Sequence, residues 1–458
     1  MQPTFQNTVQ EVDEVKDSLL LGSAVEILKN PVEFLAKLAK NYGAVVTINF
    51  AGKKYFVFQH PDYIKHVWLD NYKQYRKPGA TKLLRMFLGE GLSTSNGELW
   101  LRQRRLMQPA FHSQKLAHIT TVINEETTAF INRLQKIPDN TRIDINHELL
   151  QLTISIISRA MFNMNLKEEM DTMVNALEEL ATYAASWMKS LIKIPTNWPT
   201  PANKIFKKNC AIFDDIIYKI IDRRRREMAK ADAPVYNDLL DMLLNFCDEE
   251  TKSPMTEKLL RDEVTTLFMA GHETTAQTLS WMLYHLAKEK VINGKVKEEG
   301  LKISRGNLLL FEDIPKLIYT KQVIQETLRM YPPIWAVVRK PITEDTIYAL
   351  HLPAHSNVLL NIYGLHHHPA YWEQPENFYP EHFSAANEQQ RPVFVFIPFG
   401  GGPRLCLGHN FAMLVMHIVI NRITQSFEFA VPENYIPIVE PNITLRAKQG
   451  IQLMIKKI

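Results

Sequence analysis

One long helical segment constrains the fold of this chain more than any other feature. Residues 256–288, TEKLLRDEVTTLFMAGHETTAQTLSWMLYHLAK, carry apolar side chains at helical spacing. At 1.5 Å per residue, a helix of this length crosses a whole domain. We therefore expect the rest of the chain to pack around it.

The centre of this segment is chemically unusual. The run Ala270-Gly271-His272-Glu273-Thr274-Thr275 places a helix-weakening glycine and an acid inside an otherwise apolar stretch. Thr274 is spaced to donate a hydrogen bond to the carbonyl of Ala270, which would open the helix locally and widen a groove there. The alternative is that Gly271 serves close helix packing and that Thr274 fills space.

Strand patterns lie near both ends of the chain. Two alternating runs, from Ala44 and from Lys54, flank a turn at residues 51–53 and predict a β-hairpin. Helical spacing dominates residues 61–330 and 406–426, and strand patterns return in residues 334–362 and 427–458. Because neither strand set is large enough to fold alone, we predict one mainly α domain over residues 1–458 with small β-sheets in residues 44–60, 334–362 and 427–458. Residues 288–307 resemble an exposed loop.

Composition excludes several classes of protein. Hydrophobic residues make up 46% and charged residues 22%, so a large core can form. The net charge of +4 is too small to indicate nucleic-acid binding. Three scattered cysteines favour a reducing compartment, the cytoplasm, over a disulfide scaffold. We expect no transmembrane anchor, because no window reaches the ~18 apolar residues needed, although residues 18–28 suit docking on the core or contact with a membrane surface.

A glycine-rich loop carries Cys406. The run FGGGPRLCLGH starts at Phe399 and leads into an apolar helix. Amides at a helix N-terminus favour a thiolate over a thiol, and the glycines at 400–402 and 408 would let a flat, bulky partner approach the backbone. Such a thiolate suits a porphyrin iron. For a cysteine taken alone, an inert buried thiol beside a turn is the alternative.

This loop resembles the haem-binding signature of the cytochrome P450 family, FxxGxRxCxG. The matching residues are Phe399, Gly402, Arg404, Cys406 and Gly408. The resemblance implies a triangular, mainly helical fold with the long central helix crossing haem b, and Cys406 as the axial ligand of the iron. It covers nearly the whole chain, since further motifs follow in the family's order.

The centre of the long segment resembles the family's oxygen-activation motif, [AG]Gx[DE]T[TS]. The resemblance places Ala270 at the haem and implies that Glu273 and Thr274 steer protons to dioxygen. His272 falls at the variable position. Because both the acid and the hydroxyl are present, the resemblance favours a monooxygenase over a haem-thiolate peroxygenase or isomerase, and over a haem-based ligand sensor.

Further motifs imply contacts with the haem carboxylates. Trp100 and Arg104 resemble the family's WxxxR element, and Arg339 and Arg404 match other positions that bind haem propionates. All four residues carry fixed N–H donors suited to a carboxylate.

The family's structural brace is also present, with one departure. Glu326 and Arg329 resemble its buried ExxR pair, but PEHF places His382 where an arginine is usual. Because a histidine loses its charge near neutral pH, we expect a weaker, pH-sensitive brace. The run of histidines at 366–368 is not expected to bind a metal, because adjacent residues on regular backbone cannot all face one ion.

The resemblance leaves the substrate open but restricts its character. Three stretches, 77–92, 181–201 and 334–338, are expected to line the substrate pocket. Their apolar side chains suggest a lipophilic substrate such as a fatty acid, a terpenoid or a carotenoid-like molecule; the candidates are Trp187, Ile334, Trp335 and Val337. Each of them could equally be an ordinary core residue.

The expected partners follow from the same resemblance. Only 52 residues follow Cys406, so electrons are expected from a separate ferredoxin or flavodoxin that docks near Arg102, Arg105 and Lys115. We expect a monomer, cytoplasmic or peripheral to a membrane. The basic run at residues 223–226 is expected to be the solvated end of a helix.

Overall fold

The computed structural model describes residues 12–15, 23–50, 52–78, 82–166, 168–190, 194–232, 236, 238–246 and 254–458. The chain divides into two compact units. Unit 1 comprises Met1–Thr81 and Gln325–Cys406, and unit 2 comprises Lys82–Ile324 and Leu407–Ile458. Each unit is described by itself, and the single domain expected over residues 1–458 stays a prediction.

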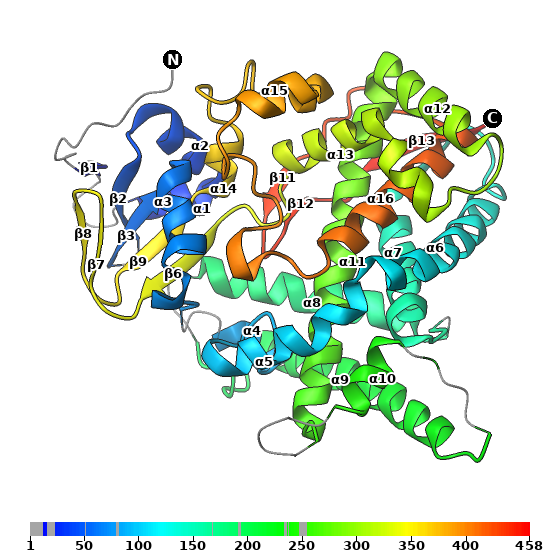
Figure 1. The fold of residues 1–458 in the computed structure, drawn as a ribbon, viewed down its shortest axis with the longest axis horizontal. Coiled ribbons are helices and arrows are strands. Elements are labelled where there is room, and N and C mark those ends of the chain that lie inside the picture. The colour runs from blue at the N-terminus through cyan, green and yellow to red at the C-terminus, as the bar shows by residue number, and fades with distance from the viewer. Residues whose placement is uncertain are drawn as a thin grey trace. The chain divides into compact units, whose positions relative to one another are not determined.

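Unit 1 is built on a six-stranded sheet of order β1-β2-β3-β9-β6-β4. The strands are β1 (Asp13–Glu14), β2 (Val45–Phe50), β3 (Lys53–Phe58), β9 (Asn357–Leu360), β6 (Val337–Pro341) and β4 (Tyr75–Arg76). Strands β2 and β3 form the predicted antiparallel hairpin. In Figure 1 the blue β3 lies beside the yellow β9, with which it pairs in parallel. Two of the regions predicted to form β-structure, residues 44–60 and 334–362, thus contribute strands to one sheet.

Unit 1 also contains short helices. They are α1 (Ala24–Lys29), α2 (Pro31–Asn41), α3 (Pro61–Lys65), α14 (Ile362–His366) and α15 (Ala385–Gln390), with the shorter turns η1 (His66–Asp70), η2 (Tyr72–Gln74), η6 (Pro380–Phe383) and η7 (Gly402–Arg404). A separate hairpin joins β7 (Asp345–Ile347) to β8 (Leu350–Leu352). Helix α2 packs Phe34, Leu35 and Leu38 against Val46 and Val57 of the sheet. Burial of these apolar side chains stabilises the layer.

Unit 2 holds most of the helices. They are α4 (Lys82–Leu88), α5 (Gly97–Met107), α6 (Ser113–Leu134), α7 (Ile145–Phe162), α8 (Met170–Lys189), α9 (Pro201–Met228), α10 (Leu239–Leu244), α11 (Glu257–Lys288), α12 (Lys290–Ser304) and α16 (His409–Ser426), with η4 (Gln108–Phe111) and η5 (Phe311–Lys316). Helix α13 (Ile318–Met330) contains the boundary between the units. The mainly α fold with small sheets is as predicted.

Helix α11 is the predicted long helix. It runs for 32 residues, and the Thr256 side chain caps it by accepting a hydrogen bond from the Leu259 amide. Most of its side chains are buried. A Cβ at Gly271 would lie 2.7 Å from Ile157 Cδ1 in α7, so this glycine permits close packing of α7. The packing role considered for Gly271 is therefore real.

Two small sheets complete unit 2. One has the order β10-β13-β5, formed by β10 (Phe427–Ala430), β13 (Gln452–Lys457) and β5 (Thr141–Asp144). The other pairs β11 (Val439–Pro441) with β12 (Leu445–Ala447). The strand β5 lies inside a region expected to be helical. Its four residues are too few to show an alternating pattern, and pairing with the distant β13 makes them a strand.

One local prediction was wrong, and another holds with one exception. Residues 290–304 form α12 rather than a loop. The helix buries Val296 and Gly300, and any side chain at position 300 would collide with Asn421 of α16.

The basic run at 223–226 lies near the end of α9, and three of its arginines are exposed, as predicted. The exception is Arg224, which is fully buried and donates hydrogen bonds to Asp238, Asp241 and the Phe162 carbonyl. Buried acceptors, which sequence spacing does not reveal, explain this exception.

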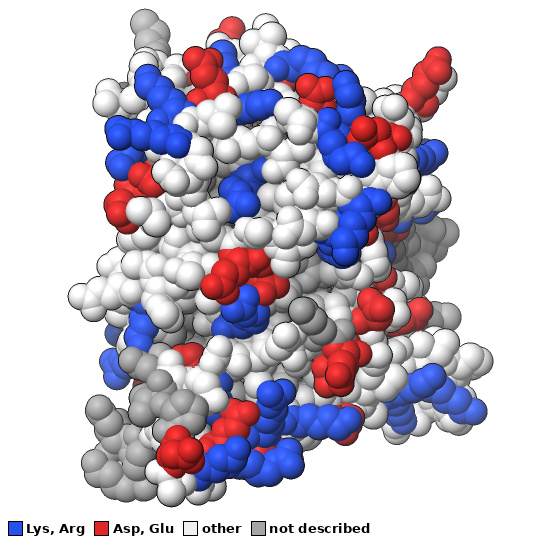
Figure 2. All heavy atoms as spheres, turned by 90° about the vertical axis from the view of Figure 1, so that its right-hand side faces the viewer, with Lys and Arg blue, Asp and Glu red and all other residues white. Residues whose placement is uncertain are grey.

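The hydropathy of the helices and the distribution of surface charge can both be described. In the part of the chain that the structure describes, no helix is long and apolar enough to cross a bilayer. Basic and acidic side chains are intermixed over the face drawn in Figure 2.

Candidate active site

The cysteine loop is held by its own backbone. The Cys406 amide donates to the Phe399 carbonyl at 2.9 Å, and the Leu405 amide donates to the Gly402 carbonyl at 3.0 Å, which closes the turn η7. The Cys406 side chain is exposed. Three residues further along the chain, α16 begins at His409. The loop thus fixes the position of a cysteine whose sulfur stays accessible to a ligand.

The glycines of this loop have different functions. Gly402 has a φ of +61°, and a side chain there would collide with the Trp68 carbonyl. A side chain at Gly401 would meet Phe394 at 2.5 Å. For these two glycines, packing against the protein is a sufficient reason for the absence of a side chain. A Cβ at Gly400 would have its nearest heavy atoms at 3.9 Å, and one at Gly408 would have no heavy atom of the described residues within 4 Å, so the expected approach of a partner stays a prediction for these two positions.

Two half-buried arginines of unit 1 provide a test of the fit to haem. Arg339 lies in β6 and Arg404 in η7. Burial, and then the positive charge of Arg404, lowers the pKa of Arg339 to about 9, and burial lowers the pKa of Arg404 to about 10. Arginine nevertheless stays protonated in proteins, so two cations are held close together at an electrostatic cost. An anion such as a haem propionate would relieve this cost, and the donor set therefore fits haem.

In unit 2, α5 carries the two other candidate ligands of the haem carboxylates. Trp100 is buried and Arg104 half-buried, one helical turn apart. This spacing puts both N–H donors on one side of the helix.

The centre of α11 carries the candidate proton-transfer pair. The Thr274 hydroxyl donates to the Ala270 carbonyl at 2.8 Å, as predicted. The helix nevertheless continues without interruption through these residues, so the predicted local opening is absent. Ala270 is exposed and Thr274 half-buried, although most of the helix is covered. These two residues therefore form an accessible stripe on α11.

Glu273 is anchored by a residue that the sequence did not single out. Its Oε1 accepts a hydrogen bond from the Thr444 hydroxyl at 2.8 Å, and both side chains are buried. Thr444 directly precedes β12. No local pattern could have identified it, because the contact joins residues far apart in the chain. The neighbouring His272 is buried with Nδ1 2.8 Å from the Phe268 carbonyl, and burial lowers its pKa despite the opposing charge of Glu273.

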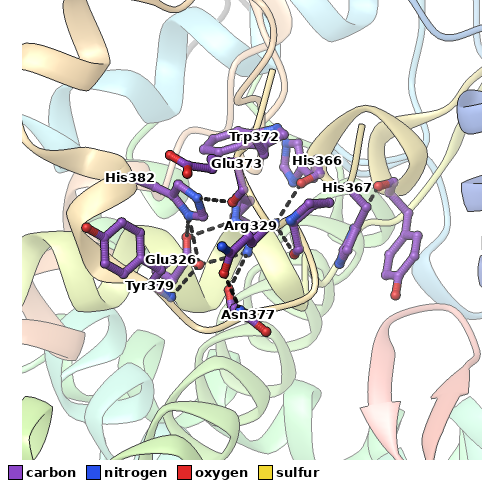
Figure 3. Close-up of polar contacts among 12 residues, drawn as sticks. Glu326, Arg329, His366, His367, Trp372, Glu373, Asn377, Tyr379 and His382 are labelled. Atoms are coloured by element: carbon purple, nitrogen blue, oxygen red, sulfur yellow. Dashed lines mark hydrogen bonds and ion pairs between the residues drawn. The ribbon is translucent and has the colours of Figure 1, made fainter. Parts of the chain in front are cut away.

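The structure brings the three residues of the expected brace together (Figure 3). Arg329 donates two hydrogen bonds to the Glu326 carboxylate, at 2.8 Å and 2.7 Å, and both side chains are fully buried. Arg329 also donates to the carbonyls of His366, Pro375 and Asn377. Burial alone would raise the pKa of Glu326, but hydrogen bonds from Arg329 and His382 lower it overall. A charged pair satisfied in this way can persist in the core.

His382 contacts an acceptor with each ring nitrogen. Nδ1 lies 3.1 Å from Oε1 of Glu326, and Nε2 lies 2.7 Å from the Glu373 carbonyl (Figure 3). A carboxylate and a carbonyl only accept hydrogen bonds, so only the doubly protonated imidazolium satisfies both contacts. Arg391, another residue that the sequence did not single out, donates to the His382 carbonyl at 2.6 Å and stacks on Trp372.

The three adjacent histidines have separate partners. His366 Nε2 accepts from the Ile397 amide, His367 Nδ1 faces the Tyr363 carbonyl, and His368 Nδ1 accepts from the Ala370 amide. Within the described ranges, no group of three or more His, Cys, Asp or Glu residues is arranged to hold a metal ion.

The substrate-pocket candidates lie in different surroundings. Trp335 and Val337 pack against hydrophobic clusters of unit 1, whereas Ile334 is exposed. Trp187, in α8 of unit 2, is half-buried. Packing gives Trp335 a core role. Residues 79–81 and 191–193 of the expected pocket stretches lie outside the described residues.

These features define a class of protein. A fixed loop that presents an exposed cysteine suits thiolate ligation of a haem iron, and the half-buried arginine pair of the same unit suits the haem carboxylates. The family model "Cytochrome P450" matches residues 16–455. The chain therefore belongs to the cytochrome P450 family.

Several relatives support the membership. The chain is 30% identical to cyclooctat-9-en-7-ol 5-monooxygenase of Streptomyces melanosporofaciens, over 88% of this chain and 85% of the relative. It is 30% identical to cytochrome P450 4F3 of Homo sapiens, over 87% and 80%. It is 26% identical to the chloroplastic protein LUTEIN DEFICIENT 5 of Arabidopsis thaliana, over 95% and 76%. The chain is a haem-thiolate monooxygenase that uses O2, an organic substrate and a redox partner.

Proposed function

We propose that this enzyme hydroxylates a lipophilic molecule at a haem b held by Cys406. The observation that carries the proposal is the cysteine loop, in which the Cys406 amide is tied to the Phe399 carbonyl while the sulfur stays exposed. When bound, the haem supplies the iron at which O2 is reduced, and a thiolate ligand favours cleavage of the O–O bond.

Several residues of each unit would hold the cofactor. Arg339 and Arg404 of unit 1 would donate hydrogen bonds to the propionates, and this would neutralise the positive charge of the arginine pair. In unit 2, Trp100 and Arg104 carry further donors for the propionates, and the bare backbone at Gly408 and the exposed Ala270 would leave these positions accessible to the haem.

Glu273 and Thr274 hold and move protons. In the conformation described, the Thr274 hydroxyl donates to the Ala270 carbonyl, so its oxygen lone pairs remain available to accept a hydrogen bond from water. Glu273 is anchored through one carboxylate oxygen by Thr444, which leaves the other oxygen to exchange a proton.

We propose a terpenoid-like substrate as the first to test. The name of one relative denotes oxidation of cyclooctat-9-en-7-ol. In unit 1 the exposed Ile334 and the half-buried Val337 offer apolar surface, and in unit 2 Trp187 is half-buried. The electron donor would be a separate ferredoxin or flavodoxin, and the enzyme a monomer. A cytoplasmic location rests on the sparse cysteines.

Turnover under isotopically labelled O2 tests this function. With a ferredoxin, its reductase and a panel of terpenoid, fatty-acid and carotenoid substrates, we expect a product with one labelled oxygen atom, and none from Cys406→Ser. Turnover that needs no external electrons would instead indicate a peroxygenase or an isomerase. Reversible O2 binding without any product would indicate a sensor.

A further inference from the structure

His366 is a buried residue that the functions above leave unexplained. It ends α14, and its side chain is fully buried in unit 1. In the sequence it stands out only as a member of the histidine run at 366–368. The three histidines of this run have separate hydrogen-bond partners. A polar side chain at complete burial needs a partner that justifies its desolvation.

The partner of the His366 ring is the backbone of Ile397. The Ile397 amide donates to Nε2 at 2.9 Å. Because an amide only donates, Nε2 must carry the lone pair, which makes the ring a neutral imidazole protonated at Nδ1. Burial, then the nearby charges of His367 and Arg329, hold the pKa of His366 well below its ordinary value. The ring therefore stays an acceptor at physiological pH.

Ile397 directly precedes the cysteine loop. Its own carbonyl accepts from the Gly400 amide at 3.0 Å, and Phe399, two residues on, accepts from the Cys406 amide at 2.9 Å. Ile397 lies outside every strand of the described chain, so no sheet ladder holds its amide. The hydrogen bond from the Ile397 amide to the His366 ring holds this backbone in place of a strand partner. It thereby fixes the position at which the cysteine loop begins.

The backbone of His366 is tied to the brace at the same time. Its carbonyl accepts from Nη1 of Arg329 at 3.0 Å, and this arginine is held by Glu326 (Figure 3). One residue thus joins the Glu326–Arg329 pair to the start of the loop, through its carbonyl on one side and its ring on the other.

We propose that His366 is a positioning residue for Cys406: by accepting the Ile397 amide at Nε2, it holds the cysteine loop at a fixed place on the Glu326–Arg329 brace. The proposal rests on the proposed role of Cys406 as the haem ligand. It predicts that an acceptor at the Nε2 position, rather than an aromatic ring, is what the site requires.

Two substitutions of His366 and one control variant distinguish a requirement for a hydrogen-bond acceptor from a requirement for an aromatic ring. His366→Gln places an amide oxygen near the position of Nε2 and keeps the acceptor. His366→Leu keeps comparable apolar volume without an acceptor. His368→Leu is the matched control, since it makes the same change two residues along, where the ring accepts a hydrogen bond from the nearby Ala370 amide.

The readouts on the haem-loaded proteins are hydrogen–deuterium exchange of residues 393–406 and the CO difference spectrum. We expect His366→Leu to exchange roughly 10-fold faster in this segment, the effect of losing about one hydrogen bond, and to lose much of the thiolate-type, red-shifted band. His366→Gln and His368→Leu should stay close to the wild type in both.

Each result has a definite meaning. Wild-type exchange and spectrum in His366→Leu would overturn the proposal, and so would equal losses in His366→Gln and His366→Leu, which would assign the site to ring packing. If His366→Leu yields no folded protein, the exchange rate in His366→Gln decides: a rate close to the wild type supports the proposal, and a rate raised about 10-fold rejects it. Absence of the red-shifted band in the wild type would instead reject the proposed function.

Discussion

At the scale of single residues, the contact between Thr444 and Glu273 bears most directly on catalysis. Thr444→Val removes a hydrogen bond to a buried carboxylate at nearly constant volume. We expect kcat to fall roughly 5- to 10-fold, because Glu273 loses the donor that fixes its orientation. Thr444→Ser, which keeps the hydroxyl, should restore most of the rate. Equal rates in the valine variant and the wild type would show that the contact is only structural.

For the pair Arg339 and Arg404, we predict that one substitution stabilises the haem-free chain but weakens the retention of haem. Arg339→Gln removes a half-buried cation whose lowered pKa means that folding disfavours its charge. The haem-free chain should therefore gain thermal stability, while haem transfer to an external acceptor protein should become about 10-fold faster. The control is Arg105→Gln, on the exposed side of α5. A loss of stability in the haem-free Arg339→Gln chain would contradict the argument.

At the scale of elements, the brace between α13 and η6 should be sensitive to acid. The Glu326 carboxylate has a lowered pKa, so its contribution to stability is present above its ordinary pKa and is lost as pH falls through the lower value. Thermal unfolding measured at decreasing pH should therefore show a loss of stability in the wild type that is smaller in Glu326→Gln.

Replacement of His382 tests its contribution to the brace. In His382→Leu, haem retention should fall, because the buried Glu326 carboxylate loses a donor, at a cost of about 1–3 kcal/mol. In His382→Arg, which keeps N–H donors at this position, retention measured by the Soret absorbance should stay close to that of the wild type. Equal retention in His382→Leu and the wild type would show that the His382 contacts do not support the brace.

Local sequence signals account for the elements that were predicted correctly. The helical spacing of apolar residues and the N-cap Thr256 define α11, and both can be recognised in the sequence. The alternation of apolar and polar residues defines the β2–β3 hairpin. Helix α12 was missed because its two glycines and many charges look like a loop, whereas its stability comes from packing on α16. Strand β5 was missed because it exists through its pairing with β13.

At the scale of the whole molecule, the same distinction separates the site residues that were predicted from those that were missed. Cys406 with Arg404, and Glu273 with Thr274, lie in contiguous motifs that can be recognised in one sequence. Thr444, Arg391 and the His366–Ile397 contact join segments far apart in the chain. Such contacts depend on tertiary packing, which no local pattern encodes.

The CO difference spectrum of the dithionite-reduced protein, with Cys406→Ser beside the wild type, tests the central claim most directly. A thiolate ligand predicts a red-shifted Soret band in the wild type that is lost in the variant. A wild type that binds no haem, or one with an imidazole-type spectrum, would contradict the assignment of Cys406 as the haem ligand, and the cysteine loop would then be a structural turn.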